Sequence, residues 1–88
     1  MYNYLAEFLG TAFFVYVVLA TGNPIAIGAA LTLVIVMISP ISGAYINPAI
    51  NIVMAAADKL PTNEIVPYSL AQIFGGLVAL EIYKRYKL

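Results

Sequence analysis

Apolar residues fill three long stretches of the chain, and short polar or turn-forming segments separate them. The stretches cover about residues 4–22, 24–40 and 65–84. Gly22-Asn23-Pro24, between the first two, is a strong turn signal. A helix needs roughly 20 apolar residues to cross a bilayer. The pattern therefore predicts three transmembrane helices, of which the second is short and is expected to gain length by also using residues 23–24 and 39–42.

A fourth apolar segment, residues 48–57, is too short to span a membrane. At about 1.5 Å per residue, its ten residues give a helix of roughly 15 Å, or half a bilayer. Asp58 and Lys59 then return the chain to water. Its length fits an interfacial helix lying flat and also a re-entrant half-helix that enters the membrane and leaves on the same side.

The start of this segment, Asn47-Pro48-Ala49, favours the re-entrant alternative. Asn is a preferred N-cap residue and Pro is preferred at the first helical position, so the triplet also fits a simple helix cap. Small and polar residues at 39–45 precede it and can pack as an extended strand. Free N–H groups at a helix start are costly in hydrocarbon. A half-helix that starts inside the membrane therefore implies a water-lined cavity, in which the Asn47 amide donates hydrogen bonds and the helix dipole repels cations.

The composition agrees with a membrane protein and excludes several kinds of site. Of the 88 residues, 64% are hydrophobic and 9% are charged, whereas soluble chains carry roughly 25% charged residues. With a net charge of zero, the chain lacks the excess of basic residues that is typical of nucleic-acid-binding proteins. Without Cys or His there is no basis for a disulfide, a zinc site or a histidine base, so no enzyme, metal or cofactor is expected.

Two further features concern the ends of the apolar stretches. Glu7 lies where a signal peptide would carry positive charge, so the first stretch is read as a spanning helix. Tyrosines lie near the segment ends, which matches the interfacial preference of this side chain: Tyr2, Tyr4, Tyr68, Tyr83 and Tyr86.

Three motifs resemble those of the major intrinsic proteins, the aquaporin and aquaglyceroporin family. Residues 42–49, SGAYINPA, resemble the family's SGxxxNPA signature; residues 6–11, AEFLGT, resemble its first helix; and residues 67–76, PYSLAQIFGG, resemble its PYxxAQxxGA third helix. The resemblance covers nearly the whole chain. It implies an all-α membrane fold: three transmembrane helices plus one re-entrant half-helix, which is half of an aquaporin-like right-handed bundle. Ile50 stands where the family's second repeat usually has Arg, so the chain is more similar to the first repeat.

The resemblance also implies roles for individual residues. Asn47 would face the lumen and donate to permeating water, and Pro48 and Ala49 would hold the half-helix tip. Glu7 would accept hydrogen bonds from the loop before the half-helix, with Gln72 as buried support. Alternatively, Glu7 lies at headgroup level, and Gln72 makes a helix–helix bond without a role in the pore. Gly10, Gly28, Gly75 and Gly76 would let helices approach closely.

Ile27 and Ile50 align with the family's selectivity filter. With both aliphatic, the pore is either apolar there and less strict, passing glycerol or other small neutral solutes, or a partner chain supplies the missing Arg.

One half-repeat cannot enclose a pore, so the expected partner, besides the lipid bilayer, is another copy of the chain in inverted orientation or a complementary half-channel chain. Lys/Arg bias sets orientation, and here it is weak. One side carries Lys59 and the amino terminus, and the other carries Lys84, Arg85 and Lys87. This bias opposes the orientation of the family's first repeat.

The expected function is a passive channel for water, small neutral solutes such as glycerol, or both, formed by two half-size subunits. The alternatives are one half of a hetero-assembled channel and a non-conducting or regulatory membrane subunit.

Overall fold

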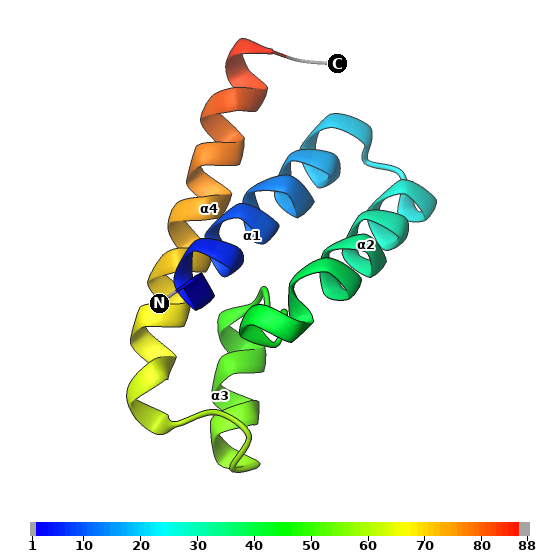
Figure 1. Ribbon diagram of the computed structural model, residues 1–88. Helices are drawn as coiled ribbons and strands as arrows, with labels where there is room; N and C mark the ends of the chain where they lie inside the picture. Colours follow the sequence, from blue (N-terminus) through cyan, green and yellow to red (C-terminus); the bar gives the residue numbers. More distant parts are fainter. Residues whose placement is uncertain (1, 87–88) are drawn as a thin grey trace.

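The computed structural model describes residues 2–86 as a bundle of helices (Figure 1), and this part of the chain contains no β-strand. The elements are α1 (Tyr2–Thr21), α2 (Pro24–Ser42), α3 (Pro48–Ala56), the short 3₁₀ turn η1 (Thr62–Glu64) and α4 (Ile65–Arg85). Helices α1 and α2, and α4 together with η1, are long and apolar enough to cross a membrane, whereas α3 has only nine residues. The predicted class, an all-α membrane protein with three spanning helices, is confirmed.

Asn-Pro pairs start two of the helices. The Asn23 Oδ1 accepts hydrogen bonds from the Ile25 and Ala26 backbone nitrogens at 2.9 and 3.0 Å, and Pro24 is the first residue of α2. The Asn47 Oδ1 accepts from the Ala49 nitrogen at 2.7 Å at the start of α3. These caps satisfy N–H groups that have no partner inside the helix.

Helix α2 continues through Pro40 to Ser42, which confirms that the second span uses residues 39–42. The extended strand expected over residues 39–45 is therefore wrong in its first part. Pro40 lies in the last turn, where its missing N–H removes one helical hydrogen bond. The Gly43 backbone nitrogen closes the helix by donating to the Ser39 carbonyl at 3.0 Å. Gly43 has φ = 93°, a left-handed conformation that suits glycine and commonly ends helices. Only residues 43–47 form the non-helical connection to α3.

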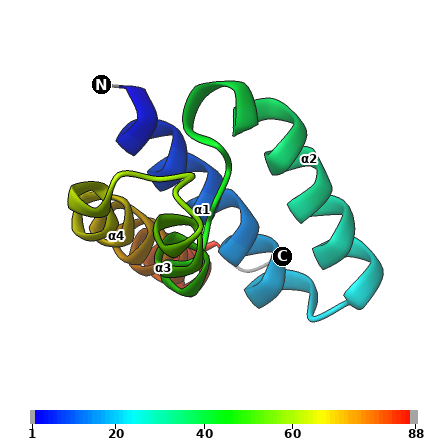
Figure 2. The same ribbon diagram turned by 90° about the horizontal axis from the view of Figure 1, so that it is seen from below.

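Helix α1 is central, because it packs along both α4 and α2, while α3 packs against α4 (Figures 1 and 2). At Gly75 helices α1 and α4 approach closely, since a Cβ atom there would lie 2.4 Å from the Phe8 carbonyl oxygen. At Gly10 a Cβ would lie 2.8 Å from the Ile38 side chain of α2. Gly28 differs from the expectation, because a Cβ there would meet no other part of residues 2–86 within 4 Å. Among the described residues, Gly28 is therefore not a packing contact between helices.

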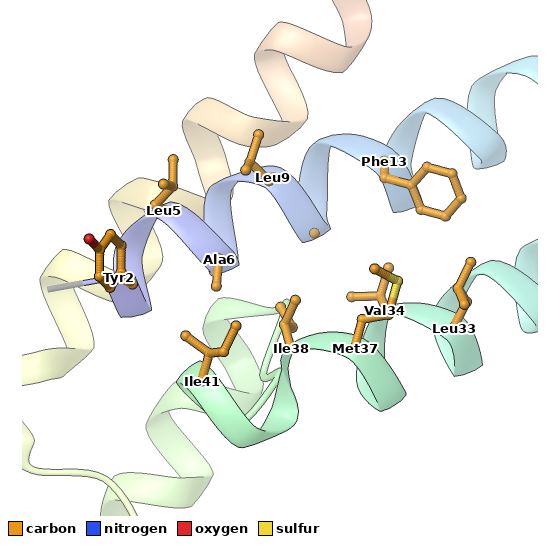
Figure 3. Close-up of a pocket in the computed structure, with 11 residues that line it drawn as sticks. Tyr2, Leu5, Ala6, Leu9, Phe13, Leu33, Val34, Met37, Ile38 and Ile41 are labelled. Atoms are coloured by element: carbon orange, nitrogen blue, oxygen red, sulfur yellow. The ribbon is translucent and has the colours of Figure 1, made fainter.

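Most of the apolar surface faces outward. In the most apolar parts of the three spanning helices, only 22%, 17% and 22% of residues are buried. Helices α1 and α2 also border an apolar groove of about 540 Å³, which is lined by Phe13 of α1 and by Leu33 and Met37 of α2, among others (Figure 3). Lipid or further protein must cover this surface in a membrane.

Candidate functional site

The Glu7 carboxylate is the centre of a buried hydrogen-bond network, and its side chain is fully buried. Its Oε1 accepts from the Ile46 backbone nitrogen at 2.8 Å and from the Gln72 Nε2 at 2.9 Å. Its Oε2 accepts from the Tyr45 backbone nitrogen at 3.1 Å and from the Ser42 hydroxyl. No ion pair involves Glu7 among residues 2–86, so four donors compensate this acid inside the bundle. The structure thus brings Glu7 and Gln72 together beneath the loop.

Gln72 extends the network to α3 through Asn51. The Asn51 Nδ2 donates to the Gln72 Oε1 at 2.8 Å and to the Ser69 hydroxyl at 3.0 Å, and the Gln72 Nε2 donates back to the Asn51 Oδ1 at 3.1 Å. Asn51 is fully buried. Sequence reasoning missed this residue, although a polar side chain one helical turn after Asn47 in an otherwise apolar segment is a usable signal.

Tyr68 also belongs to this buried region. Its side chain is 2% exposed, and its hydroxyl donates to the Ser42 carbonyl at 2.8 Å, the end of α2. The prediction of interfacial tyrosines does not describe the Tyr68 ring, which is buried within the bundle. Carbonyl groups in the last turn of a helix have no partner inside it, and Tyr68 supplies one. Of the other tyrosines in that prediction, Tyr2 and Tyr86 are 70% and 68% exposed.

The connection over residues 43–47 directs its N–H groups inward. Tyr45 and Ile46 donate to Glu7, and Ala44 donates to the Ser42 hydroxyl at 3.3 Å. A trans peptide points its C=O opposite to its N–H, so the carbonyls of Ala44 and Tyr45 point away from Glu7. None of the carbonyls of residues 43–46 accepts a hydrogen bond from within residues 2–86. The loop therefore presents a short row of free acceptors.

The backbone of residues 43–47 is strained in the conformation that directs these N–H groups toward Glu7 and Ser42. Ala44 has φ = 55° and Ile46 has φ = 64°. Left-handed conformations are unfavourable for side chains with a Cβ, and a branched residue such as Ile46 is a clear outlier. Such strain costs roughly 1–3 kcal/mol per residue and persists only where surrounding contacts impose it. The Glu7 hydrogen bonds are those contacts.

Asn47, Pro48 and Ala49 form the tip of α3. Asn47 is exposed, its Oδ1 holds the cap, and its Nδ2 has no partner among residues 2–86. The tip thus offers free donors directly after the row of free acceptors.

The two residues expected at the filter come from elements that do not pack together here. Ile27 is half-buried in the first turn of α2, and Ile50 is 39% exposed on α3. Helices α2 and α3 are not a packed pair in residues 2–86. A constriction between these side chains remains a prediction for an assembled pore.

The ionisable residues offer little to a metal ion. Within residues 2–86, no cluster of three or more His, Cys, Asp or Glu residues is present. The site's polar groups are amides, hydroxyls, backbone groups and one carboxylate.

Comparison with known proteins connects this arrangement to a family. The family profile described as "Major intrinsic protein" matches residues 1–87. Glycerol uptake facilitator protein-like 6 of Lactiplantibacillus plantarum is 37% identical over 98% of this chain and 44% of its own length. Aquaporin Z of Bradyrhizobium diazoefficiens is 32% identical over 93% of this chain and 40% of its own length. Aquaporin-8 of Notomys alexis is 32% identical over 91% of this chain and 35% of its own length.

No solved structure gives a significant match. The chain spans less than half the length of the curated relatives it matches. The family match nevertheless covers nearly all of this chain, and three of its helices have the length and apolarity of membrane spans. The chain is therefore a multi-pass integral membrane protein that belongs to the major intrinsic protein family.

Proposed function

We propose that the chain forms one half of a passive transmembrane pore for water and small neutral solutes. The observation that carries this proposal is the row of unpaired polar groups in the connection from α2 to α3. Free backbone carbonyls over residues 43–46 lead directly to the free amide donors of Asn47. Such a row has no structural partner in the described part of the chain, and unsatisfied polar groups inside a membrane need water or a polar solute beside them.

The geometry suits a permeant that both donates and accepts hydrogen bonds. Water can donate to the loop carbonyls and accept from the Asn47 amide without losing all its hydrogen bonds on the way. The N-terminus of α3 carries about half a positive charge, which disfavours cations at the same point. No bond is made or broken, so passage requires no catalytic residue. The names of the relatives, which include a glycerol uptake facilitator and aquaporins, agree with this class of permeant.

A second half-repeat has to complete the pore. With nine residues at about 1.5 Å each, α3 reaches roughly halfway across a bilayer. We propose that a second copy of the chain in the opposite orientation supplies the other half-helix, because inverted repeats around a midplane site are a common solution in transporters. The outward apolar surface of α1 and α2 leaves ample area for such a contact. In this assembly, Ile27 and Ile50 form an aliphatic constriction that admits solutes of glycerol size.

The experiment is osmotic shrinkage of vesicles that contain the purified chain, followed by stopped-flow light scattering. Asn47→Asp keeps a good N-cap but replaces the amide donors with a charged acceptor at the tip. Loss of one buried hydrogen bond to the permeant corresponds to about 1.4 kcal/mol, so we expect roughly a tenfold fall in water flux.

Asn23→Asp is the matched control. Asn23 also precedes a proline and also caps a helix, but it lies at the end of a spanning helix. We expect Asn23→Asp to retain the flux of the unmodified chain. Equal flux in Asn47→Asp and Asn23→Asp would contradict the proposed role of the tip.

A further inference from the structure

Helix α3 has few features that could fix its rotation about its own axis. It has nine residues, and Asn51 is its only buried residue. Its apolar side chains are largely outward, with Ile50, Ile52 and Val53 exposed by 39%, 58% and 61%. In lipid, an apolar side chain gains little by facing protein rather than acyl chains. Apolar packing therefore does not select one rotation of α3 strongly.

Polar contacts of the Asn51 side chain do select one rotation of α3. Its amide binds Ser69 and, in both directions, Gln72, at 3.0, 2.8 and 3.1 Å. Both partners lie on α4, which packs closely along α1. Gln72 is itself held by Glu7 on α1 at 2.9 Å. Rotating α3 would remove the Asn51 amide from these partners and leave buried polar groups unpaired, which is costly inside a bundle.

The rotation of α3 also determines where Asn47 points. Asn51 follows Asn47 by four residues, and the Asn51 backbone nitrogen donates to the Asn47 carbonyl at 3.1 Å in the first helical bond. We propose that Asn51 is a positioning residue that fixes the rotation of α3 and thereby the direction in which Asn47 presents its free amide donors. This inference rests on the proposed function, because the direction of Asn47 matters only if a permeant passes the tip.

The helix geometry makes the proposal testable with two reporters. Successive residues of an α-helix are about 100° apart around its axis. Ile50 and Ile52 therefore lie on opposite sides of the direction set by Asn51. When Asn51 fixes the rotation, one of them faces the aqueous path and the other faces lipid or protein. By the expected place of Ile50 at the constriction, Ile50 is the one that faces water.

The chain contains no cysteine, so single reporters can be introduced without removing native thiols. Ile50→Cys and Ile52→Cys are placed separately in the otherwise unmodified chain and again together with Asn51→Leu. The full-length proteins are reconstituted into vesicles and treated with a small, charged, membrane-impermeant thiol reagent. Each initial rate is divided by the rate of the same variant after denaturation in detergent, which corrects for intrinsic reactivity and protein amount.

With Asn51 present, we expect the cysteine at position 50 to react about tenfold faster than the one at position 52, a ratio that corresponds to roughly 1.4 kcal/mol of preference for one rotation. With Asn51→Leu, we expect the two rates to approach each other. Val53→Ala is the matched control, since it changes an exposed side chain of α3 without touching the network, and the rate ratio should persist. A rate ratio that Asn51→Leu leaves unchanged would overturn the proposal.

If Asn51→Leu does not insert, Asn51→Ser provides the same comparison, because a hydroxyl stays on the same face but the reciprocal pair with Gln72 is lost. Water flux measured on the same vesicles separates this inference from the proposed function. Flux from the unmodified chain with an unchanged cysteine ratio contradicts only the role of Asn51. Absence of flux, with a ratio that still depends on Asn51, contradicts only the channel.

Discussion

Glu7→Gln tests whether one carboxylate holds the strained loop in place. Gln has nearly the same shape as Glu but offers one oxygen acceptor and one amide donor group. On one side Glu7 faces the Ile46 N–H, which can only donate, and the Gln72 amide, which could accept only by turning over and breaking its bonds with Asn51. On the other side it faces the Tyr45 N–H and the Ser42 hydroxyl, and a hydroxyl can rotate to accept. The introduced amide group therefore turns toward Ser42 and leaves the Tyr45 N–H without an acceptor.

The expected effect of Glu7→Gln on the stability of the loop follows from the Tyr45 N–H that loses its acceptor. A buried N–H without a partner costs roughly 1–3 kcal/mol, which is a factor of about 5 to 150 in the opening equilibrium of the loop. The Ile46 N–H keeps an oxygen acceptor, so its loss of stabilisation is smaller. Replacing the carboxylate by leucine would orphan all four donors, and the loop conformation would then not survive.

Hydrogen exchange read by residue measures this difference. In the purified chain in micelles, we expect exchange of the Tyr45 amide to accelerate by about 5- to 150-fold in Glu7→Gln, with a smaller change at Ile46. Helix amides in the middle of α2 serve as the internal reference. Unchanged protection at Tyr45 in a folded Glu7→Gln variant would refute the account of Glu7 as the acceptor that imposes the loop conformation.

Two further substitutions probe the packing around the site. Gly75→Ala should lower the free energy of unfolding by about 1–3 kcal/mol, because its Cβ would lie 2.4 Å from the Phe8 carbonyl oxygen. Gly76→Ala is the control and should be tolerated, because the nearest atom to its Cβ lies at 3.8 Å. Denaturation in mixed micelles compares the two variants, and equal losses of stability would argue against the close α1–α4 contact. Tyr68→Phe removes the donor to the Ser42 carbonyl and should cost about 0.5–1.5 kcal/mol in the same assay; a variant as stable as the unmodified chain would show that this bond does not hold the end of α2.

The helices could be predicted from the sequence because their signals are local. The apolar composition of each stretch, the turn signal at residues 22–24 and the Asn47-Pro48 start of α3 can each be read from neighbouring residues. The end of α2 was harder to place, since the rule that helices stop before proline competes with the C-cap bond that Gly43 makes. The local rule alone does not show that one missing hydrogen bond in a last turn is tolerable.

The site was predictable only in part, because its geometry depends on which face of each helix is buried. Glu7 and Gln72 were expected through the resemblance, and both are polar groups within apolar stretches. Asn51 is likewise a polar residue in an apolar segment, but it lies close to Asn47-Pro48-Ala49, to which the polar character of this segment was assigned. Tyr68 lies near the start of α4, and proximity to a helix end does not show whether a tyrosine points to the interface or inward under Ser42. Gly28 could not be told from Gly10 by residue type, yet only Gly10 meets another helix.

Osmotic shrinkage of vesicles that contain only the unmodified chain tests the central claim most directly, with insertion and helical content verified beforehand. The account predicts a protein-dependent water flux well above that of empty vesicles, with the low activation energy of passage through a pore. A flux equal to that of empty vesicles, from protein shown to be folded and inserted, would contradict the claim that two copies of this chain complete the channel.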